Sequence, residues 1–225
     1  MSCYYQGCSR PGTTKEHIPP KSFFPKDQRN QLLTVTSCEL HNIEKSSDDI
    51  YVLAQICLNA SPSNRSREVW KRSVLPQLDY SGEALRKTLR SDAISLPSGA
   101  VAYKVDTVRV DRFFNALSFG TVFKACGERL PAQYSIEHVY HNFWDPGETP
   151  EEKEYKNHLL SSHSGEPIAV LDFGRVRALN TSVYSVKVFG ISEFRSSITI
   201  VHDFFGVFRV TSMLTRQIDH PRPHV

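Results

Sequence analysis

The stretches TKEHIPPKSFF (residues 14–24) and QLLTVTSCELHN (residues 31–42) decide the fold that we expect for the N-terminal part of the chain. The second stretch changes from a β-branched alternation, typical of a short strand, to a helical pattern that begins at Glu39. The first stretch places Glu16 and His17 directly before Ile-Pro-Pro. Because proline restricts its own φ and the residue before it, the two prolines fix the direction in which the chain leaves this pair.

The composition is that of a folded protein with a small excess of basic residues. The chain has 225 residues, of which 40% are hydrophobic, so it can bury a sizeable core. Its formal charge of +3 permits a nucleic-acid partner without requiring one. No run approaches the ~18 apolar residues of a membrane-spanning helix, and the N-terminus is polar. We therefore expect a soluble, cytoplasmic protein with no membrane partner.

Two close pairs of metal-ligand residues occur near the N-terminus, Cys3-x4-Cys8 and Cys38-x2-His41. A structural zinc site usually takes its four ligands as two such pairs. The five cysteines are odd in number and follow no export signal, which argues against a disulfide framework. The pattern predicts one structural Zn²⁺; the alternative is that these are ordinary thiols and a histidine on a helix surface.

A second group of polar residues is expected beside the zinc ligands. If zinc joins residues 3–8 to residues 38–41, the segment between them must leave and return, which brings Glu16 and His17 towards Asn42. Oxygen ligands suit Mg²⁺ or Mn²⁺, and a neighbouring imidazole can act as a base towards water. This combination suits metal-assisted hydrolysis of a phosphodiester.

The combined pattern C-x4-C … KEHIPPKSFF … LLTVTSCELHNIEKSSDD resembles the zinc-bearing branch of the HNH endonucleases over residues 1–50. The resemblance implies a ββα-metal fold in which His17 is the general base. It also implies that Glu16 and Asn42 hold Mg²⁺ or Mn²⁺, and that Lys45 offsets charge on the phosphorane.

Three positions depart from the family pattern. Glu16 stands where the family has aspartate, and His41 replaces a cysteine in the second zinc pair. The family's middle asparagine is expected near Leu33, and Asn30 is the closest asparagine to that position.

The resemblance implies a metal-dependent endonuclease that hydrolyses DNA, in a bacterial or phage-type context. Two alternatives stay open. The protein can be a zinc-bearing module that binds nucleic acid without catalysis, or it can be a nuclease directed at RNA.

The whole chain is predicted to be α+β in three segments. These are a nuclease module over residues 1–60, a basic helical segment over residues 61–95 and an α+β domain over residues 100–225. Helical patterns cover residues 66–78, 81–92 and 105–126, a linker is expected at 96–100, a polar loop with at most a short helix at 145–157, and antiparallel strands at 167–173, 182–191 and 196–210.

The basic segment carries seven cations against three acids between Asn64 and Arg90. Most such clusters are solvated helix faces. Beside a nuclease site they can instead contact a phosphate backbone, and we assign that role to Arg65, Arg67, Lys71 and Arg72.

Two further groups are discounted. Glu137, His138 and His141 could bind a metal, but no second ligand pair follows at a suitable spacing, so structural histidines are the default. Asp48 and Asp49 are expected to be solvated residues of the first long helix.

Overall fold

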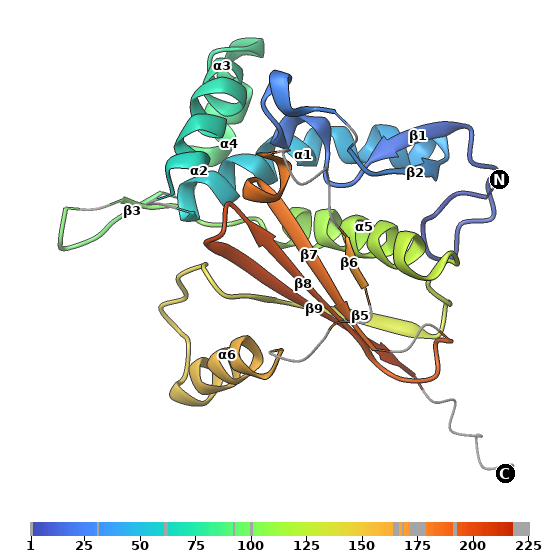
Figure 1. Cartoon of the computed structure of the whole chain (residues 1–225). Helices are drawn as coiled ribbons and strands as arrows, with labels where there is room; N and C mark the ends of the chain where they lie inside the picture. The colour runs from blue at the N-terminus through green and yellow to red at the C-terminus, as the bar shows by residue number, and fades with distance from the viewer. Residues whose placement is uncertain are drawn as a thin grey trace, which may run out of the picture.

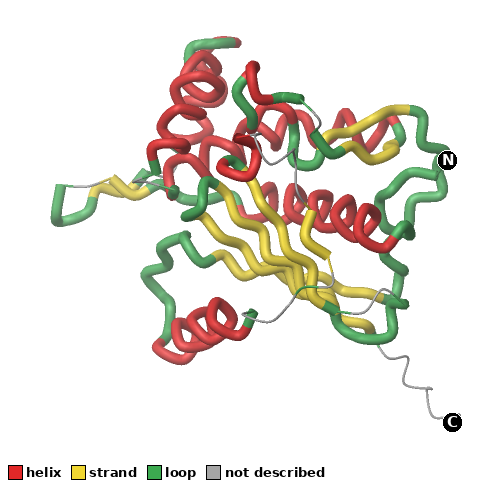
Figure 2. Tube along the Cα trace, viewed as in Figure 1, coloured by secondary structure: helices red, strands yellow, loops and turns green. Residues whose placement is uncertain are grey.

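The computed structural model describes residues 2–30, 32–60, 63–91, 93–99, 101–163, 167, 169–171, 179–190 and 193–217, except for the side chains of residues 44–47, 81, 169–171 and 179. The described chain is α+β, and its three sheets are antiparallel, as the sequence predicts (Figures 1 and 2). None of the helices formed by these residues is long and apolar enough to cross a membrane.

The N-terminal part is a two-stranded hairpin followed by a long helix. Strand β1 (Thr14–His17) pairs with β2 (Thr34–Ser37), and helix α1 (Glu39–Asn59) follows. The 3-10 turns η1 (Lys21–Phe23) and η2 (Lys26–Gln28) lie between the strands. Strand β2 is thus shorter than the strand predicted over residues 31–37. Strand β1 ends at His17, and the amide of Ile18 makes one more hydrogen bond, to the carbonyl of Leu33 at 3.1 Å. Hydrogen bonding then stops because Pro19 and Pro20 have no N–H to donate.

The basic middle is helical, as predicted, with one irregular turn. Its elements are α2 (Asn64–Val69), the π-helical segment η3 (Trp70–Val74), α3 (Leu75–Leu78), the 3-10 turn η4 (Ser81–Glu83) and α4 (Ala84–Arg90). The amide of Leu75 bonds to the carbonyl of Trp70, five residues earlier. This wider turn lies directly before Pro76, whose ring would clash with the preceding carbonyl in a regular α-helix.

Residues 96–99 of the predicted linker over 96–100 form the turn of a small hairpin instead, and residue 100 lies outside the described residues. Strand β3 (Ile94–Ser95) pairs with β4 (Val101–Ala102) on either side of this turn. Gly99 has φ +79, a left-handed conformation that suits glycine, and its amide bonds to the carbonyl of Leu96 at 2.9 Å.

The C-terminal part is a five-stranded sheet in the order β5-β9-β8-β7-β6. The remaining elements are α5 (Thr107–Cys126), β5 (Tyr134–Tyr140), α6 (Pro150–Ser162), β6 (Ala169–Leu171), the 3-10 turn η5 (Leu179–Ser182), β7 (Tyr184–Phe189), β8 (Ile198–Phe204) and β9 (Phe208–Arg216).

Each of the three predicted strand regions holds a strand within its described residues, and the helix over 105–126 is confirmed; residues 168, 172, 173 and 191 of the predicted strands lie outside the described residues. The run over 196–210 holds β8 and the start of β9, and β5 was not predicted as a strand. Helix α6 has 13 residues, so the expectation of a short helix at most was wrong. A capping box between Thr149 and Glu152, with Pro150 in the first turn, starts this helix.

Helix α5 lies between the N-terminal part and the sheet (Figure 1). On one side, a Cβ at Gly120 would come within 2.9 Å of Cγ2 of Ile18, so only glycine allows this close approach. The ring of Phe23 stacks on Phe113 of α5 at 5.3 Å and contacts Phe204 of β8 at 5.5 Å. The buried core is therefore shared by all three predicted segments.

The side of α5 that faces the sheet carries polar groups beside the buried ring of Phe114, which contacts His138 and His202. Nε2 of His138 lies 3.0 Å from Oδ1 of Asn115, and its Nδ1 lies 2.8 Å from Oγ of Ser212. Nε2 of His202 lies 3.2 Å from Oγ of Ser118. Its Nδ1 lies 2.7 Å from the hydroxyl of Tyr184. We call this row of hydrogen bonds, which also includes the bond from Tyr140 to Asp111, the polar seam.

The histidines of the polar seam are held neutral. Burial lowers the pKa of His138 to about 4. Burial, and then the charge of His138, lowers the pKa of His202 well below its ordinary value. A neutral imidazole has one donor nitrogen and one acceptor nitrogen, and the groups on the two sides of each ring can serve both because a hydroxyl donates as well as accepts.

We predict that the free energy of unfolding falls as the pH is lowered. The ordinary pKa of histidine is 6.5, whereas that of folded His138 is about 4. Between these two pH values, His138 is protonated in the unfolded chain and neutral in the folded protein. This one group should cost about 3 kcal/mol of stability over that range. Denaturant unfolding at several pH values measures it. The His138→Gln variant should show a smaller pH slope, whereas replacement of the exposed His158 should leave the slope unchanged.

Candidate metal centre

The N-terminal loop is held alongside the first hairpin by backbone hydrogen bonds. The amide of Tyr4 donates to the carbonyl of Thr36 in β2 at 2.9 Å, and the amide of Cys3 donates to the backbone carbonyl of Arg10 at 3.3 Å. This pairing places Cys3 and Cys8 opposite the end of β2, where Cys38 caps helix α1. His41 follows in the first turn of the same helix.

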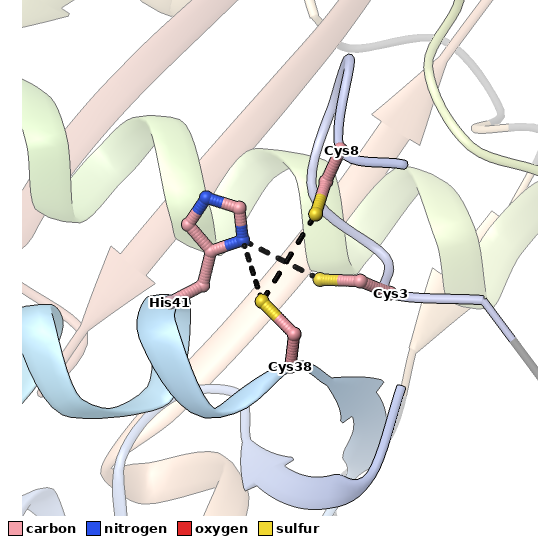
Figure 3. Close-up of side chains that lie close together, drawn as sticks. All are labelled: Cys3, Cys8, Cys38 and His41. Carbon is pink, nitrogen blue, oxygen red and sulfur yellow. Dashed lines mark hydrogen bonds between the residues drawn. The ribbon is translucent and has the colours of Figure 1, made fainter. Parts of the chain in front are cut away.

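The ligand atoms of Cys3, Cys8, Cys38 and His41 all lie within 4.8 Å of one another (Figure 3). Nδ1 of His41 is 3.5 Å from Sγ of Cys3 and 3.3 Å from Sγ of Cys38. The sulfurs of Cys8 and Cys38 are 4.0 Å apart. Around tetrahedral zinc, ideal bond lengths give separations of ~3.8 Å between sulfurs and ~3.5 Å between sulfur and nitrogen. The cluster could therefore hold a metal ion such as zinc.

The start of helix α1 favours a thiolate at Cys38. Burial alone raises the pKa of this thiol, but the amide N–H groups of His41 and Leu40 and the neighbouring thiols outweigh burial, so the pKa is lowered. Burial raises the pKa of Cys3, which has no helix terminus of its own. Cys38 thus ionises more readily than Cys3, and a bound cation would stabilise further thiolates.

Aromatic packing orients the imidazole of His41. The ring of Tyr5 stacks on it with centroids 3.9 Å apart, and Tyr5 in turn meets the edge of Phe119 at 4.9 Å. Phe119 belongs to α5, so the position of a candidate ligand depends on the central helix. Tyr5 was not among the residues predicted from the sequence, and its place inside the Cys3-x4-Cys8 spacing is the sequence signal that points to it.

The loop also binds the chain that follows α5. Nε2 of Gln6 donates to the carbonyls of Pro131 at 2.7 Å and Tyr134 at 3.0 Å. The guanidinium of Arg129 donates to the carbonyl of Cys8. These contacts join residues more than 100 positions apart, and no local pattern could have predicted them.

The residues proposed to act beside the zinc ligands lie on adjoining elements, because β1 packs against α1. Glu16 is buried at 5% exposure and faces Val35 across the hairpin. Asn42 is half-buried in the first turn of α1, next to His41. The side chain of Lys45 lies outside the described residues.

The environment of Glu16 and His17 is partly buried and charged. Burial, and then the neighbouring Glu16 carboxylate, raises the pKa of Tyr4 well above its ordinary value. His17 is half-buried; burial and then the Lys21 ammonium lower its pKa, against the opposing effect of Glu16. The imidazole of His17 is therefore neutral at pH 7 and able to accept a proton.

The four cations proposed to bind phosphate differ in what they contact. Arg65 pairs with Glu68 and donates to Oγ of Ser182 at 3.1 Å. Arg72 pairs with Asp27 at 3.1 Å and with Glu68 at 3.5 Å. Arg65 and Arg72 are thus paired with acids of the chain. Arg67 donates to Oδ1 of Asn64 at 2.9 Å, and Arg67, Lys71 and Arg72 are all exposed.

A polar cavity of about 760 Å³ lies next to Arg72. Lys26 and Arg29 from the segment between β1 and β2 also line it. Nε of Arg29 donates to the carbonyl of Phe24 at 3.0 Å, which fixes part of its side chain. Lys26 and Arg29 were not among the predicted phosphate-binding residues, because they lie outside the basic segment.

The groups discounted from the sequence have structural partners. His138 belongs to the polar seam, and Nε2 of His141 lies 2.9 Å from Oγ1 of Thr211, so the structural interpretation of both histidines is confirmed. The expectation that Asp48 is solvated was wrong. Its carboxylate is buried and pairs with Arg109 at 2.8 Å and Arg112 at 3.1 Å, both on α5.

Comparisons of the chain with protein-family models, with curated proteins and with solved structures found no match.

We predict that the purified protein contains one tightly bound Zn²⁺ and that Cys38→Ser removes it. Structural zinc can contribute ~10 kcal/mol or more to folding, so this variant should also unfold the N-terminal part. Metal analysis and thermal unfolding measure both effects. Cys126→Ser, outside the cluster, is the matched control and should keep its metal. Protein prepared without chelator that carries no stoichiometric zinc would contradict the prediction.

Proposed function

We propose that this protein is a metal-dependent endonuclease of the HNH type that hydrolyses DNA. One observation carries the proposal: an antiparallel hairpin and a helix meet at a cluster of four candidate metal ligands, with Glu16 and His17 at the end of the first strand. The order of these parts along the chain agrees with the family resemblance of the sequence. The cluster supports a structural zinc site rather than a catalytic one, because four protein ligands leave no open position.

His17 is proposed as the general base. A neutral imidazole can accept a proton from the water that attacks phosphorus, and the lowered pKa of His17 supports that state at pH 7. Structural binding alone gives no use for an acid–histidine pair at this position, which supports catalysis over the alternative of a non-catalytic nucleic-acid-binding module.

Glu16 and Asn42 are proposed to hold Mg²⁺ or Mn²⁺ through their oxygen atoms. Within the described part of the chain, Glu16 belongs to no second group of three or more His, Cys, Asp or Glu donors. Such an ion would therefore complete its shell with water and phosphate oxygens, as Mg²⁺ commonly does. When bound, it would supply charge stabilisation for the leaving 3′ oxygen. Lys45 is proposed to offset the remaining negative charge.

The cations of the basic segment are proposed to bind the phosphate backbone. Arg67 and Lys71 are exposed, and the cavity beside Arg72 adds Lys26 and Arg29 to the same part of the surface. Arg65 and Arg72 already pair with acids of the chain, so they would have to exchange these partners for phosphates.

We predict that the protein nicks or linearises supercoiled plasmid in the presence of Mg²⁺ or Mn²⁺, and that EDTA stops the reaction. The His17→Ala variant should lose about 10²–10⁴-fold in rate, because a positioned general base typically contributes that much. It should keep its zinc and its fold. His158→Ala, an exposed histidine of α6, is the control and should cut normally.

Three outcomes separate the alternatives. A zinc-loaded, folded His17→Ala protein that cuts within a few-fold of the unaltered protein would overturn the role of His17. Cleavage of RNA but not of plasmid would assign the RNA-directed alternative. Binding of DNA without cleavage under any divalent ion would leave the non-catalytic module.

We predict that DNA affinity falls steeply with salt. Each phosphate contact that is lost should flatten the slope of log affinity against log salt by about 0.9 on duplex DNA. The Arg67→Ala, Lys71→Ala double variant should therefore flatten it by about 2. Replacement of the exposed Lys187 on β7 should not change it. An unaltered slope in the double variant would show that Arg67 and Lys71 do not contact phosphates and belong to a solvated helix face.

A further inference from the structure

A cavity of about 880 Å³ lies at the free edge of the C-terminal sheet, apart from the metal centre. Its wall includes four consecutive residues of β5, Glu137 to Tyr140, so it reaches both faces of that strand. Residues 102–105, which follow the β3–β4 hairpin, also line the cavity. Figure 1 shows β5 at the border of the sheet.

The backbone of β5 offers hydrogen-bonding groups to this cavity. Among the described residues, β5 pairs only with β9. Gln217 donates to the carbonyl of Gln133 at 2.8 Å, and His141 donates to that of Arg209 at 3.2 Å. In an antiparallel ladder alternate residues bond to the partner, so the odd-numbered residues face β9. The N–H and C=O groups of His138 and Tyr140 therefore point to the open edge.

The two sides of the cavity differ in chemistry. On the face that carries α5, the wall includes Tyr140, which contacts the ring of Phe143 at 5.2 Å; Tyr103 also lines the cavity. On the other face the wall carries the carboxylates of Glu137 from β5 and Glu152 from α6, together with Val139 and Tyr155. Helix α6 is fixed there by the hydroxyl of Tyr155, which lies 3.2 Å from Sδ of Met213.

The charge of the wall is opposite to that of the whole protein. Four carboxylates and two lysines line the cavity, although the chain has a formal charge of +3. One of the two lysines, Lys156, already pairs with Glu148. A positively charged occupant fits this wall, and an acidic one does not.

We propose that the edge of β5 binds an extended peptide in which basic and apolar residues alternate. The peptide adds a strand to the sheet through the backbone groups of His138 and Tyr140. Because successive side chains of a strand point to opposite faces, its basic residues lie beside Glu137 and Glu152. Its apolar residues lie against Tyr103, Tyr140 and Phe143. This site is independent of the proposed nuclease function, because it uses none of the same residues.

The test uses the full-length protein and two short labelled peptides, one alternating lysine with valine and one alternating glutamate with valine. Fluorescence anisotropy should show saturable binding of the lysine peptide only. The Glu137→Lys variant should weaken that binding about three- to tenfold, in keeping with a partly exposed charge pair. Glu193→Lys, an exposed change away from the cavity, should leave it unaltered.

Amide hydrogen exchange distinguishes strand addition from simple charge attraction. The lysine peptide should slow exchange at His138 and Tyr140, and a version with methylated backbone nitrogens should not bind. Equal binding of both peptides, or binding without protection of these amides, overturns the proposal. Protection that grows with protein concentration in the absence of peptide, together with a dimeric mass, assigns the edge to a second copy and also overturns it.

Discussion

Helix α5 has to satisfy two different surfaces at once, and the arrangement of the whole chain depends on this. One side is apolar and packs so closely on the N-terminal part that Gly120 touches Ile18. The other side carries Asn115 and Ser118, which hydrogen-bond to histidines of the sheet. Because a buried polar group without a partner costs about 1–3 kcal/mol, these bonds fix how far the helix can turn or slide. The N-terminal part and the C-terminal sheet are thereby held in one position relative to each other, through α5.

The candidate metal centre depends on the same helix. Its ligands come from a loop and from the start of α1, but the ring of His41 is oriented through Tyr5 by Phe119 of α5. The buried carboxylate of Asp48 pairs with Arg109 and with the largely exposed Arg112, which joins α1 to α5 further along. Breaking such a pair by removing one partner leaves a buried charge and is strongly destabilising. The geometry of the site is therefore set by contacts far from it as well as by its own ligands.

The parts of the structure that could be predicted from the sequence are those set by local spacing. Two close pairs of ligands predicted the cluster of Cys3, Cys8, Cys38 and His41, and periodicity predicted α1 and α5. The other parts of the structure depend on contacts between residues that are far apart in the sequence. His138 meets Asn115 across 23 positions, and Asp48 meets Arg109 across 61, so neither leaves a local pattern. Strand β5 was missed because Glu137 and His138, with His141 just beyond the strand, suggested a ligand set, whereas Glu137 and His138 lie on opposite faces of the sheet.

The insertion of Phe23 between α5 and β8 limits how this chain can be divided. A fragment that ends after α1 would contain every candidate ligand, yet it would leave Phe23, Ile18 and Tyr4, all buried in the intact chain, facing water. An excised N-terminal fragment would therefore tend to aggregate even when its metal is bound. The smallest portion that can be transplanted to another protein has to extend through α5, and its new host has to offer polar groups to Asn115 and Ser118 in place of the sheet.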